Sequence, residues 1–205
     1  MIVDLTQTIH EDMQVFEKRV KPLQIPWANL KTHGYDLELI FMSSHTGTHI
    51  DAPKHFGYKT SIDEIAIDRF VSDARLLRIE KSKDELITRD DLLAYDIDAK
   101  SVIISTSWED KKDEDEYLLA NPGLSIDAAE YLVEKKVNLV GIDTASIDAA
   151  KDDKFSAHHI LLRNDVLIVE NLCNLKSLPD RFKLIVLPLK LRGATGSPVR
   201  AIAII

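Results

Sequence analysis

Three histidines and an aspartate that could do chemistry lie close together in residues 44–56. His45 and His49 are four residues apart, so one helical turn or a tight loop could direct both imidazoles at the same point. Asp51 follows after a single apolar residue, and His55 comes shortly after it. Imidazole nitrogen together with carboxylate oxygen suits a borderline or hard divalent ion. This stretch therefore predicts a metal or catalytic site.

The residues between these candidates are consistent with a built site. Gly47 allows backbone conformations that other residues avoid, and Pro53 stiffens the exit from the stretch. The hydroxyls of Thr46 and Thr48 could hold the ligands in place. A lone histidine is usually a surface or core residue, but this concentration of histidines beside a carboxylate favours a site.

Composition limits the class of protein. The chain has 205 residues, of which 45% are hydrophobic and 29% charged, as expected for one domain spanning residues 1–205. Its net charge of -8 argues against nucleic acid and anionic membrane as main partners. Cys173 is the single cysteine, which fits a reducing, cytoplasmic location. No signal peptide or membrane-spanning apolar run is apparent. The expected partner is a small-molecule substrate.

Hydrophobic patterning predicts a layered α/β or α+β domain in which strands outnumber helices. Pro22 and Pro26 predict an irregular segment. Helices are expected over 126–136, with Ile126 on the apolar face, and over 155–162, and a capping box at Thr88 and Asp91 starts a third helix. Strands are expected over 2–6, 35–44, 74–80, 101–107, 137–142, 166–169, 182–189 and 199–205.

Several of these elements end at residues with a possible role. The strand over 35–44 delivers the chain to His45, and sites often lie where a strand ends. Glu170 ends an apolar strand, so it is either exposed at an edge or held by a cation. The polar residues of 143–148 could line a site or simply form a turn. Phe16, in a polar loop, is a packing plug or a ring offered to a ligand.

The central stretch also resembles the signature of a known family. His45-Thr-Gly-Thr-His49-Ile-Asp51-Ala-Pro-Lys-His55 is similar to the motif of the cyclase family, whose best-known members are the bacterial kynurenine formamidases. The likeness covers nearly the whole chain, and further matching segments are Asp4–Thr6, Tyr117–Ala129, Gly141–Asp148, His158–Leu172 and Pro188–Arg200.

This resemblance implies a swivelling β/β/α domain that works as a homodimer or tetramer and holds one or two divalent ions, usually zinc or manganese. His45, His49 and Asp51 would hold the first ion. Asp51 would bridge to a second ion, shared with His158 and Glu170. The family pattern selects His158 rather than its neighbour because its distance from Glu170 along the chain fits.

The resemblance also implies two roles near the metal. His55 would be the acid/base residue, and Phe16 falls where formamidases carry a substrate-contacting tryptophan. The chain departs from the family at Glu17-Lys18-Arg19, at Asn164-Asp165 and at Thr106-Ser107-Trp108. These departures leave the metal residues in place and bear on the choice of substrate.

Three functions follow from this site. The first is a metal-dependent amidase or formamidase, in which bound water is activated and His55 gives a proton to the leaving amine. The second is a hydrolase of a cyclic amide or lactone, such as an isatin-like ring, and the third is a non-catalytic metal-binding protein. A serine or cysteine nucleophile is less favoured, because the sequence has no Gly-x-Ser-x-Gly elbow and Cys173 is more typical of a core residue.

Overall fold

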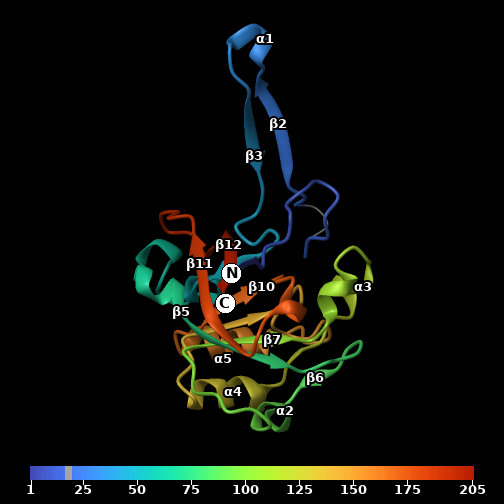
Figure 1. Cartoon of the computed structure of the whole chain (residues 1–205), viewed down its shortest axis with the longest axis vertical. Helices are drawn as coiled ribbons and strands as arrows, with labels where there is room; N and C mark the ends of the chain where they lie inside the picture. Colours follow the sequence, from blue (N-terminus) through green and yellow to red (C-terminus); the bar gives the residue numbers. More distant parts are fainter. Residues whose placement is uncertain (17–19) are drawn as a thin grey trace.

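A curved sheet forms the body of the molecule, which the computed structural model describes over residues 1–16 and 20–205 (Figure 1). Lys18 and Arg19, where the family pattern is lost, lie outside these residues. The strands of the sheet are β1 (Ile2–Asp4), β4 (His49–Asp51), β5 (Val71–Arg78), β7 (Ser101–Ser105), β9 (Leu139–Ile142), β10 (Leu167–Glu170), β11 (Arg181–Pro188) and β12 (Gly196–Ile204). They follow the order β1-β12-β11-β5-β7-β9-β10-β4.

The sheet closes on itself through β4. This short strand pairs with β10 on one side and also with β12, so the two ends of the sheet meet. Strand β1 remains outside the ring and pairs antiparallel with β12. The parallel strands β5, β7, β9 and β10 lie together, and β7, β9 and β10 are buried along their whole length, as such strands usually are.

Two hydrophobic cores follow from the alternation of side chains along these strands. Ile103 of β7 belongs to the core inside the ring, while its neighbours Val102 and Ile104 pack on the outer face against helices. In β10, likewise, Val169 faces inward and Ile168 outward. Burying each such side chain contributes about 1.5–3 kcal/mol, and both cores depend on the closed sheet.

Helices α2 (Arg89–Leu93), α4 (Ile126–Glu134) and α5 (Ser156–Arg163) cover the outer face. The predicted capping box is confirmed, since Thr88 accepts from the Asp91 amide and the Asp91 carboxylate accepts from the Thr88 amide. The prediction for Ile126 was wrong: this side chain is 55% exposed, and Ala128 and Leu132 fill the core instead. Shorter elements are α3 (Glu116–Leu119), β6 (Leu86–Ile87) and β8 (Gly123–Leu124).

A two-stranded arm projects away from the body (Figure 1). It consists of β2 (Leu23–Ala28), α1 (Leu30–His33) and β3 (Leu37–Phe41). The prediction of irregular structure around Pro26 was therefore wrong. Each strand of a two-stranded ribbon is an edge strand, so proline, which lacks an N–H, is tolerated there. The pairing also shifts register between Pro26 and Ala28. Large apolar side chains remain exposed along the arm: Leu23, Ile25, Trp27, Leu30, Tyr35, Leu37, Leu39, Ile40 and Phe41.

The α/β class and the sheet-dominated core that the sequence predicts are both confirmed. Among the described residues, no helix combines the length and the hydropathy needed to cross a bilayer.

One buried carboxylate has no cationic partner among residues 1–16 and 20–205. Asp143, directly after β9, is fully buried and accepts hydrogen bonds from the amide and hydroxyl of Thr106. Burial raises the pKa of Asp143 to about 6, and the hydrogen bonds from Thr106 offset this rise only in part. The folded protein therefore binds this proton more tightly than the unfolded chain does.

Stability should consequently fall as the pH rises through the pKa of Asp143. A rise from the ordinary 3.8 to about 6 corresponds to about 3 kcal/mol, present below pH ~4 and lost above pH ~6. Asp143→Asn has no titrating group at this position, so we expect the variant to be free of this loss. The unfolding free energy of the variant minus that of the wild type should therefore increase by about that amount from pH 4 to 7.5. Urea unfolding of both proteins in chelator measures the difference, and parallel curves would contradict it.

Candidate metal centre and active site

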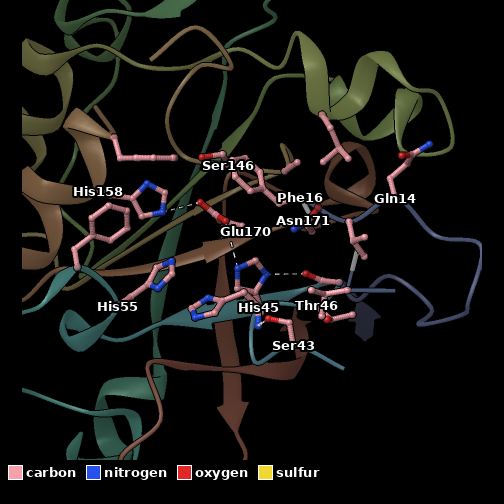
Figure 2. Close-up of a pocket in the computed structure, with 18 residues that line it drawn as sticks. Gln14, Phe16, Ser43, His45, Thr46, His55, Ser146, His158, Glu170 and Asn171 are labelled. Atoms are coloured by element: carbon pink, nitrogen blue, oxygen red, sulfur yellow. Dashed lines mark hydrogen bonds and ion pairs between the residues drawn. The ribbon is translucent and has the colours of Figure 1, made fainter. Parts of the chain in front are cut away.

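The residues that the sequence singled out meet at one cavity of about 450 Å³ (Figure 2). Asp51 does not line the cavity but lies fully buried beside it. Phe16, at the cavity, is 60% exposed. The predicted site residues that line the cavity are Phe16, His45, His49, His55, His158 and Glu170.

The register of β4 explains how three of them come together. In the pairing of β10 with β4, Glu170 lies opposite His49, and Ile168 lies opposite Asp51. Cross-strand partners share a face, and alternate residues of one strand do so too. His49, Asp51 and Glu170 therefore share one face of the sheet. Ile50 points to the other face and packs in the core inside the ring.

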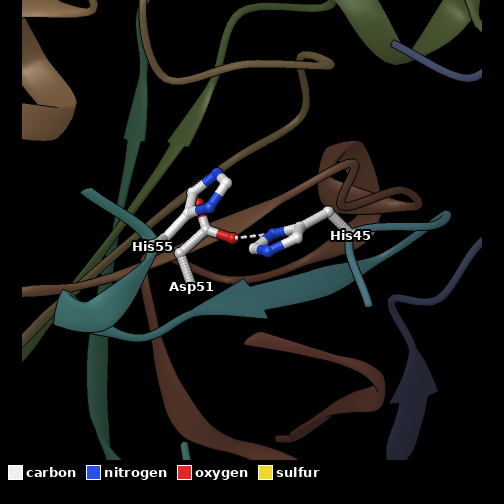
Figure 3. Close-up of side chains that lie close together, drawn as sticks. All are labelled: His45, Asp51 and His55. Carbon is white, nitrogen blue, oxygen red and sulfur yellow. Dashed lines mark hydrogen bonds and ion pairs between the residues drawn. The ribbon is translucent and has the colours of Figure 1, made fainter. Parts of the chain in front are cut away.

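A tight loop before β4 brings in His45, so the loop alternative applies and not the helical turn. His45 Nδ1 lies 2.6 Å from Asp51 Oδ1, and the His55 ring stacks on the His45 ring with centroids 3.8 Å apart (Figure 3). Gly47 turns the loop with a φ of 61°, and its carbonyl accepts from His49 Nδ1 at 2.8 Å. Gly196 leaves room for the imidazole, because a Cβ there would lie 2.7 Å from His45 Cε1.

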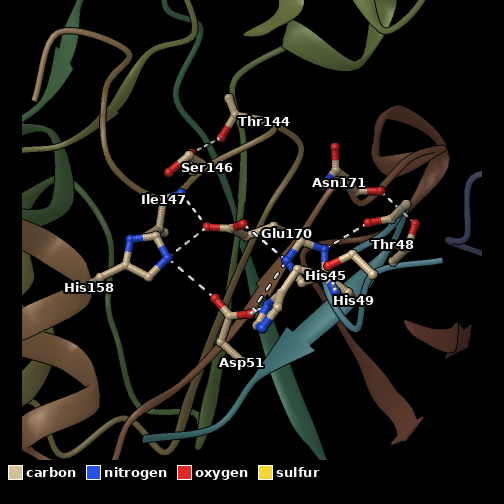
Figure 4. Close-up of polar contacts among 12 residues, drawn as sticks. His45, Thr48, His49, Asp51, Thr144, Ser146, Ile147, His158, Glu170 and Asn171 are labelled. Atoms are coloured by element: carbon tan, nitrogen blue, oxygen red, sulfur yellow. Dashed lines mark hydrogen bonds and ion pairs between the residues drawn. The ribbon is translucent and has the colours of Figure 1, made fainter. Parts of the chain in front are cut away.

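His158 reaches the same cluster from α5, which lies on the outer face of the sheet. Its Nε2 lies 3.3 Å from Asp51 Oδ2 and 3.2 Å from Glu170 Oε1 (Figure 4). The Asp148 carboxylate contacts His158 Nδ1 and accepts from the Ala157 amide at 2.6 Å. Asp148 thus orients both the imidazole and the first turn of α5. The structure brings all five predicted metal residues together.

The distances in this cluster fit ligands of divalent ions. His49 Nε2 lies 3.4 Å from Asp51 Oδ1 and 3.3 Å from Glu170 Oε2. His158 Nε2 makes contacts of similar length with the other oxygens of the same carboxylates. Ligand atoms about 2.0–2.1 Å from a tetrahedral ion lie about 3.3–3.4 Å from one another. These separations are long for hydrogen bonds and fit ligand atoms arranged around a bound divalent ion.

In His45, His49 and His158, the ring nitrogen that points away from the carboxylates has a polar partner within the protein, as is usual for metal ligands. Thr195 Oγ1 lies 2.9 Å from His45 Nε2. Asp148 holds His158, and the carbonyl of the tight loop holds His49. Each imidazole therefore directs its other nitrogen toward the carboxylates, and the residues present fit a divalent metal.

The charges of the cluster also call for a cation. Burial alone would lower the pKa of His49, but the Asp51 and Glu170 carboxylates raise it to about 9. The pKa of His158 lies well above its usual value for the same reason, with Asp148 contributing most. Hydrogen bonds from His158 and His45 overcome the effect of burial and hold the pKa of Asp51 well below its usual range. Protons on these imidazoles compensate charge that a metal ion would neutralise on binding.

His55 has a different environment from the other imidazoles. It lies in the 3₁₀ turn η1 (Pro53–Phe56), and its ring is partly exposed to the cavity. Burial lowers the pKa of His55 to about 4, and the nearby Asp51 carboxylate only partly opposes this shift. A neutral imidazole beside the cluster can accept a proton at neutral pH.

Phenylalanine rings form an apolar part of the cavity. The Phe155 ring lies 6.2 Å from Phe16 and 5.6 Å from Phe56, between centroids. Phe155 adopts a left-handed conformation with a φ of 52°, which is rare and costly for a bulky residue. Its backbone strain and its place in the cavity together mark it as a candidate functional residue.

Sequence reasoning missed Phe155, Asp148 and Thr195 as individual site residues. Asp148 carried a signal, since it belongs to the polar run after a buried strand, but a turn was an equally good explanation. Phe155 and Thr195 carried none that local patterns could reveal. Cys173 does not line the cavity, and burial raises the pKa of its thiol to about 11, so the structure gives no support to a cysteine nucleophile.

Comparisons with known proteins agree with this site. The family model described as "Putative cyclase" matches residues 3–149. Kynurenine formamidase of Bacillus thuringiensis (strain Al Hakam) is 30% identical over 203 residues, covering 98% of this chain and 95% of the relative. The enzyme of the same name from Bacillus mycoides (strain KBAB4) is 31% identical over the same coverage.

Solved structures are similar over the whole chain. An isatin hydrolase bound to the product analogue thioisatinate has a TM-score of 0.92 and 27% identity, covering 100% of this chain and 92% of its own. A "predicted metal-dependent hydrolase from Bacillus stearothermophilus" has a TM-score of 0.83 and 30% identity, covering 99% and 97%.

The contact between Asp148 and His158 predicts a role in metal affinity. We expect Asp148→Asn to weaken metal binding about 10–100-fold, because the imidazole loses the carboxylate that orients it. Competition with a chelating dye measures the affinity. Asp152→Asn is the matched control, since Asp152 accepts from the Ser156 amide near the same helix start and, within the described part of the chain, makes no hydrogen bond to the imidazole. Equal affinities of both variants and the wild type would contradict the role.

Proposed function

Because the chain belongs to the cyclase family, we propose that it is a metal-dependent amidohydrolase acting on a small N-acyl substrate. The activity that fits best is that of an arylformamidase, which converts N-formylkynurenine to kynurenine and formate. One observation carries this proposal: five side chains from three separate segments of the chain meet beside the free imidazole of His55. They are His45, His49, Asp51, His158 and Glu170.

In this proposal the cluster holds two ions, zinc by preference or manganese. His45, His49 and Asp51 would hold the first ion, and His158 and Glu170, together with Asp51, would hold the second. The mixed nitrogen and oxygen donors suit both metals. Bound divalent ions supply Lewis acidity, which polarises a carbonyl and acidifies water.

The protein itself supplies proton transfer and substrate orientation. His55, neutral at working pH, accepts the proton of the attacking water and delivers it to the nitrogen that leaves. Its stacking on His45 keeps the ring beside the cluster. The phenylalanine wall around Phe16 and Phe155 receives an aromatic ring of the substrate, and the cavity has the volume of typical small-molecule sites.

Hydrolysis of a cyclic amide is the second candidate. The high structural similarity to an isatin hydrolase favours it, and ring opening needs the same metal cluster and proton carrier. The two activities differ only in whether the acyl carbon is tethered to the ring, so assays of N-formylkynurenine and isatin side by side separate them.

We further propose that the whole chain works as one unit within a homodimer or tetramer in the cytoplasm. The exposed apolar side chains of the arm support self-association, since an isolated two-stranded hairpin is marginal in water and such patches mark interfaces. A second copy that covers the arm would stabilise it. The single cysteine is consistent with a reducing compartment.

Replacing His55 tests the mechanism. We expect His55→Ala to retain its metal content and to lose about 10²–10⁴-fold in kcat, because the proton carrier is gone. Turnover of N-formylkynurenine and of isatin, with metal content measured by atomic emission, checks both expectations. His33→Ala, on the arm, is the control. A fully active His55→Ala protein, or wild-type turnover that survives complete metal removal, would contradict the mechanism.

Trp27 tests association through the arm. This side chain is 66% exposed on β2, and we expect Trp27→Glu to shift the protein from oligomer to monomer at micromolar concentration, since a charge would be buried in the contact. Sedimentation velocity measures the change. Ile67→Glu replaces an apolar residue that is 75% exposed on the body and should leave the oligomer intact. A monomeric wild type would refute the arm's role.

A further inference from the structure

Asn171, the residue after the proposed metal ligand Glu170, is fixed in the cavity wall by its backbone. It leaves β10 with a φ of 59°, a left-handed conformation that asparagine tolerates better than most residues. Its amide donates to the Thr144 carbonyl at 2.9 Å, and its carbonyl accepts from Thr48 Oγ1 at 2.6 Å. Both backbone groups are thus paired, which holds the backbone of Asn171 in place.

One half of the Asn171 side chain is occupied within the protein. The Tyr117 hydroxyl lies 2.9 Å from Asn171 Oδ1 and 3.2 Å from the Asp143 carbonyl oxygen, and its one proton is donated to the nearer oxygen, that of Asn171. Burial raises the pKa of Tyr117 well above its usual value, so the phenol keeps its proton and remains a donor. Gln7 Nε2 donates in turn to the phenol oxygen at 3.2 Å. Asn171 Nδ2 has no hydrogen-bond partner among the residues outside 17–19, and Asn171 lines the cavity.

A second polar group on the cavity wall lacks a partner. Thr46 Oγ1 is buried and makes no hydrogen bond within the described part of the chain. In Figure 2, Thr46 and Asn171 lie to the right of Glu170 and His45. His55 and His158 lie to their left. Thr46 Oγ1 is shielded from the cavity, so Asn171 Nδ2 is the unpaired donor on this wall that a ligand acceptor can reach.

We propose that Asn171 Nδ2 donates a hydrogen bond to a second carbonyl of the substrate, on the ring carbon next to the one that bears the acylated nitrogen. The reacting acyl group belongs beside His55, on the other side of the cluster, so the Asn171 wall meets a different oxygen. N-formylkynurenine and isatin both carry such an ortho carbonyl. This inference rests on the proposed function and assigns Asn171 the role of selecting substrates by that carbonyl.

The test uses a substrate pair that differs only in this carbonyl, 2′-acetylformanilide and 2′-ethylformanilide. We expect the wild type to favour the acetyl compound at least about tenfold in kcat/KM, and Asn171→Gly to reduce this preference to about twofold or less. Glycine keeps the left-handed backbone while removing the amide. Because the acetyl group also changes the reactivity of the anilide, the measured quantity is the change in the ratio between the two proteins.

Asn174→Gly is the matched control. Asn174 has the same left-handed backbone, with a φ of 61°, but it does not line the cavity. This variant should keep the wild-type preference. If Asn171→Gly keeps it as well, or slows both substrates equally, the proposal is overturned, because Asn171 then contributes to folding or to the shared formyl group.

Binding of the amine products gives a readout that does not depend on turnover. We expect 2-aminoacetophenone to bind the metal-loaded wild type about tenfold more tightly than 2-ethylaniline, and Asn171→Gly to bind the two about equally. Isothermal titration measures both affinities. A wild type that hydrolyses neither formanilide refutes the proposed function, while the affinity ratio still decides the role of Asn171.

Discussion

Compensation of buried negative charge is the constraint on which the site depends. Asp51 and Glu170 are withdrawn from water among three imidazoles, and two such carboxylates repel each other strongly in a medium of low dielectric constant. Protons on His49 and His158, or metal ions in their place, remove this repulsion. The fold therefore stabilises a cluster that is complete only when it carries positive charge.

Closure of the sheet positions this cluster. Strand β4 has only three residues, yet it pairs with both β10 and β12 and fixes which side chains face the cavity. A slip of one residue would exchange His49 and Asp51 for Ile50 on that face. The sheet also positions part of the cavity wall, since Asn171 follows Glu170 directly after β10 and its carbonyl accepts a hydrogen bond from Thr48. The proposed metal ligands and the proposed substrate wall thus depend on the same strand pairs.

The candidate ligands and the layered fold could be predicted from the sequence because both depend on local patterns. His45, His49 and Asp51 are adjacent, and the buried strands and the Thr88 cap follow periodicity and turn chemistry. Partners at long range were less accessible: the place of Asp148 beside His158 and that of Thr195 beside His45 depend on tertiary packing. The arm was misjudged because Pro26 argues against a strand only in a paired sheet interior.

Phe155 links two parts of the molecule that could otherwise change independently. Its ring belongs to the cavity wall, and its left-handed backbone starts the helix that carries His158. An exchange at position 155 would alter the shape offered to a substrate and, through the entry to α5, the aim of a metal ligand. Libraries that vary this residue to broaden the range of accepted compounds would therefore select for metal retention at the same time.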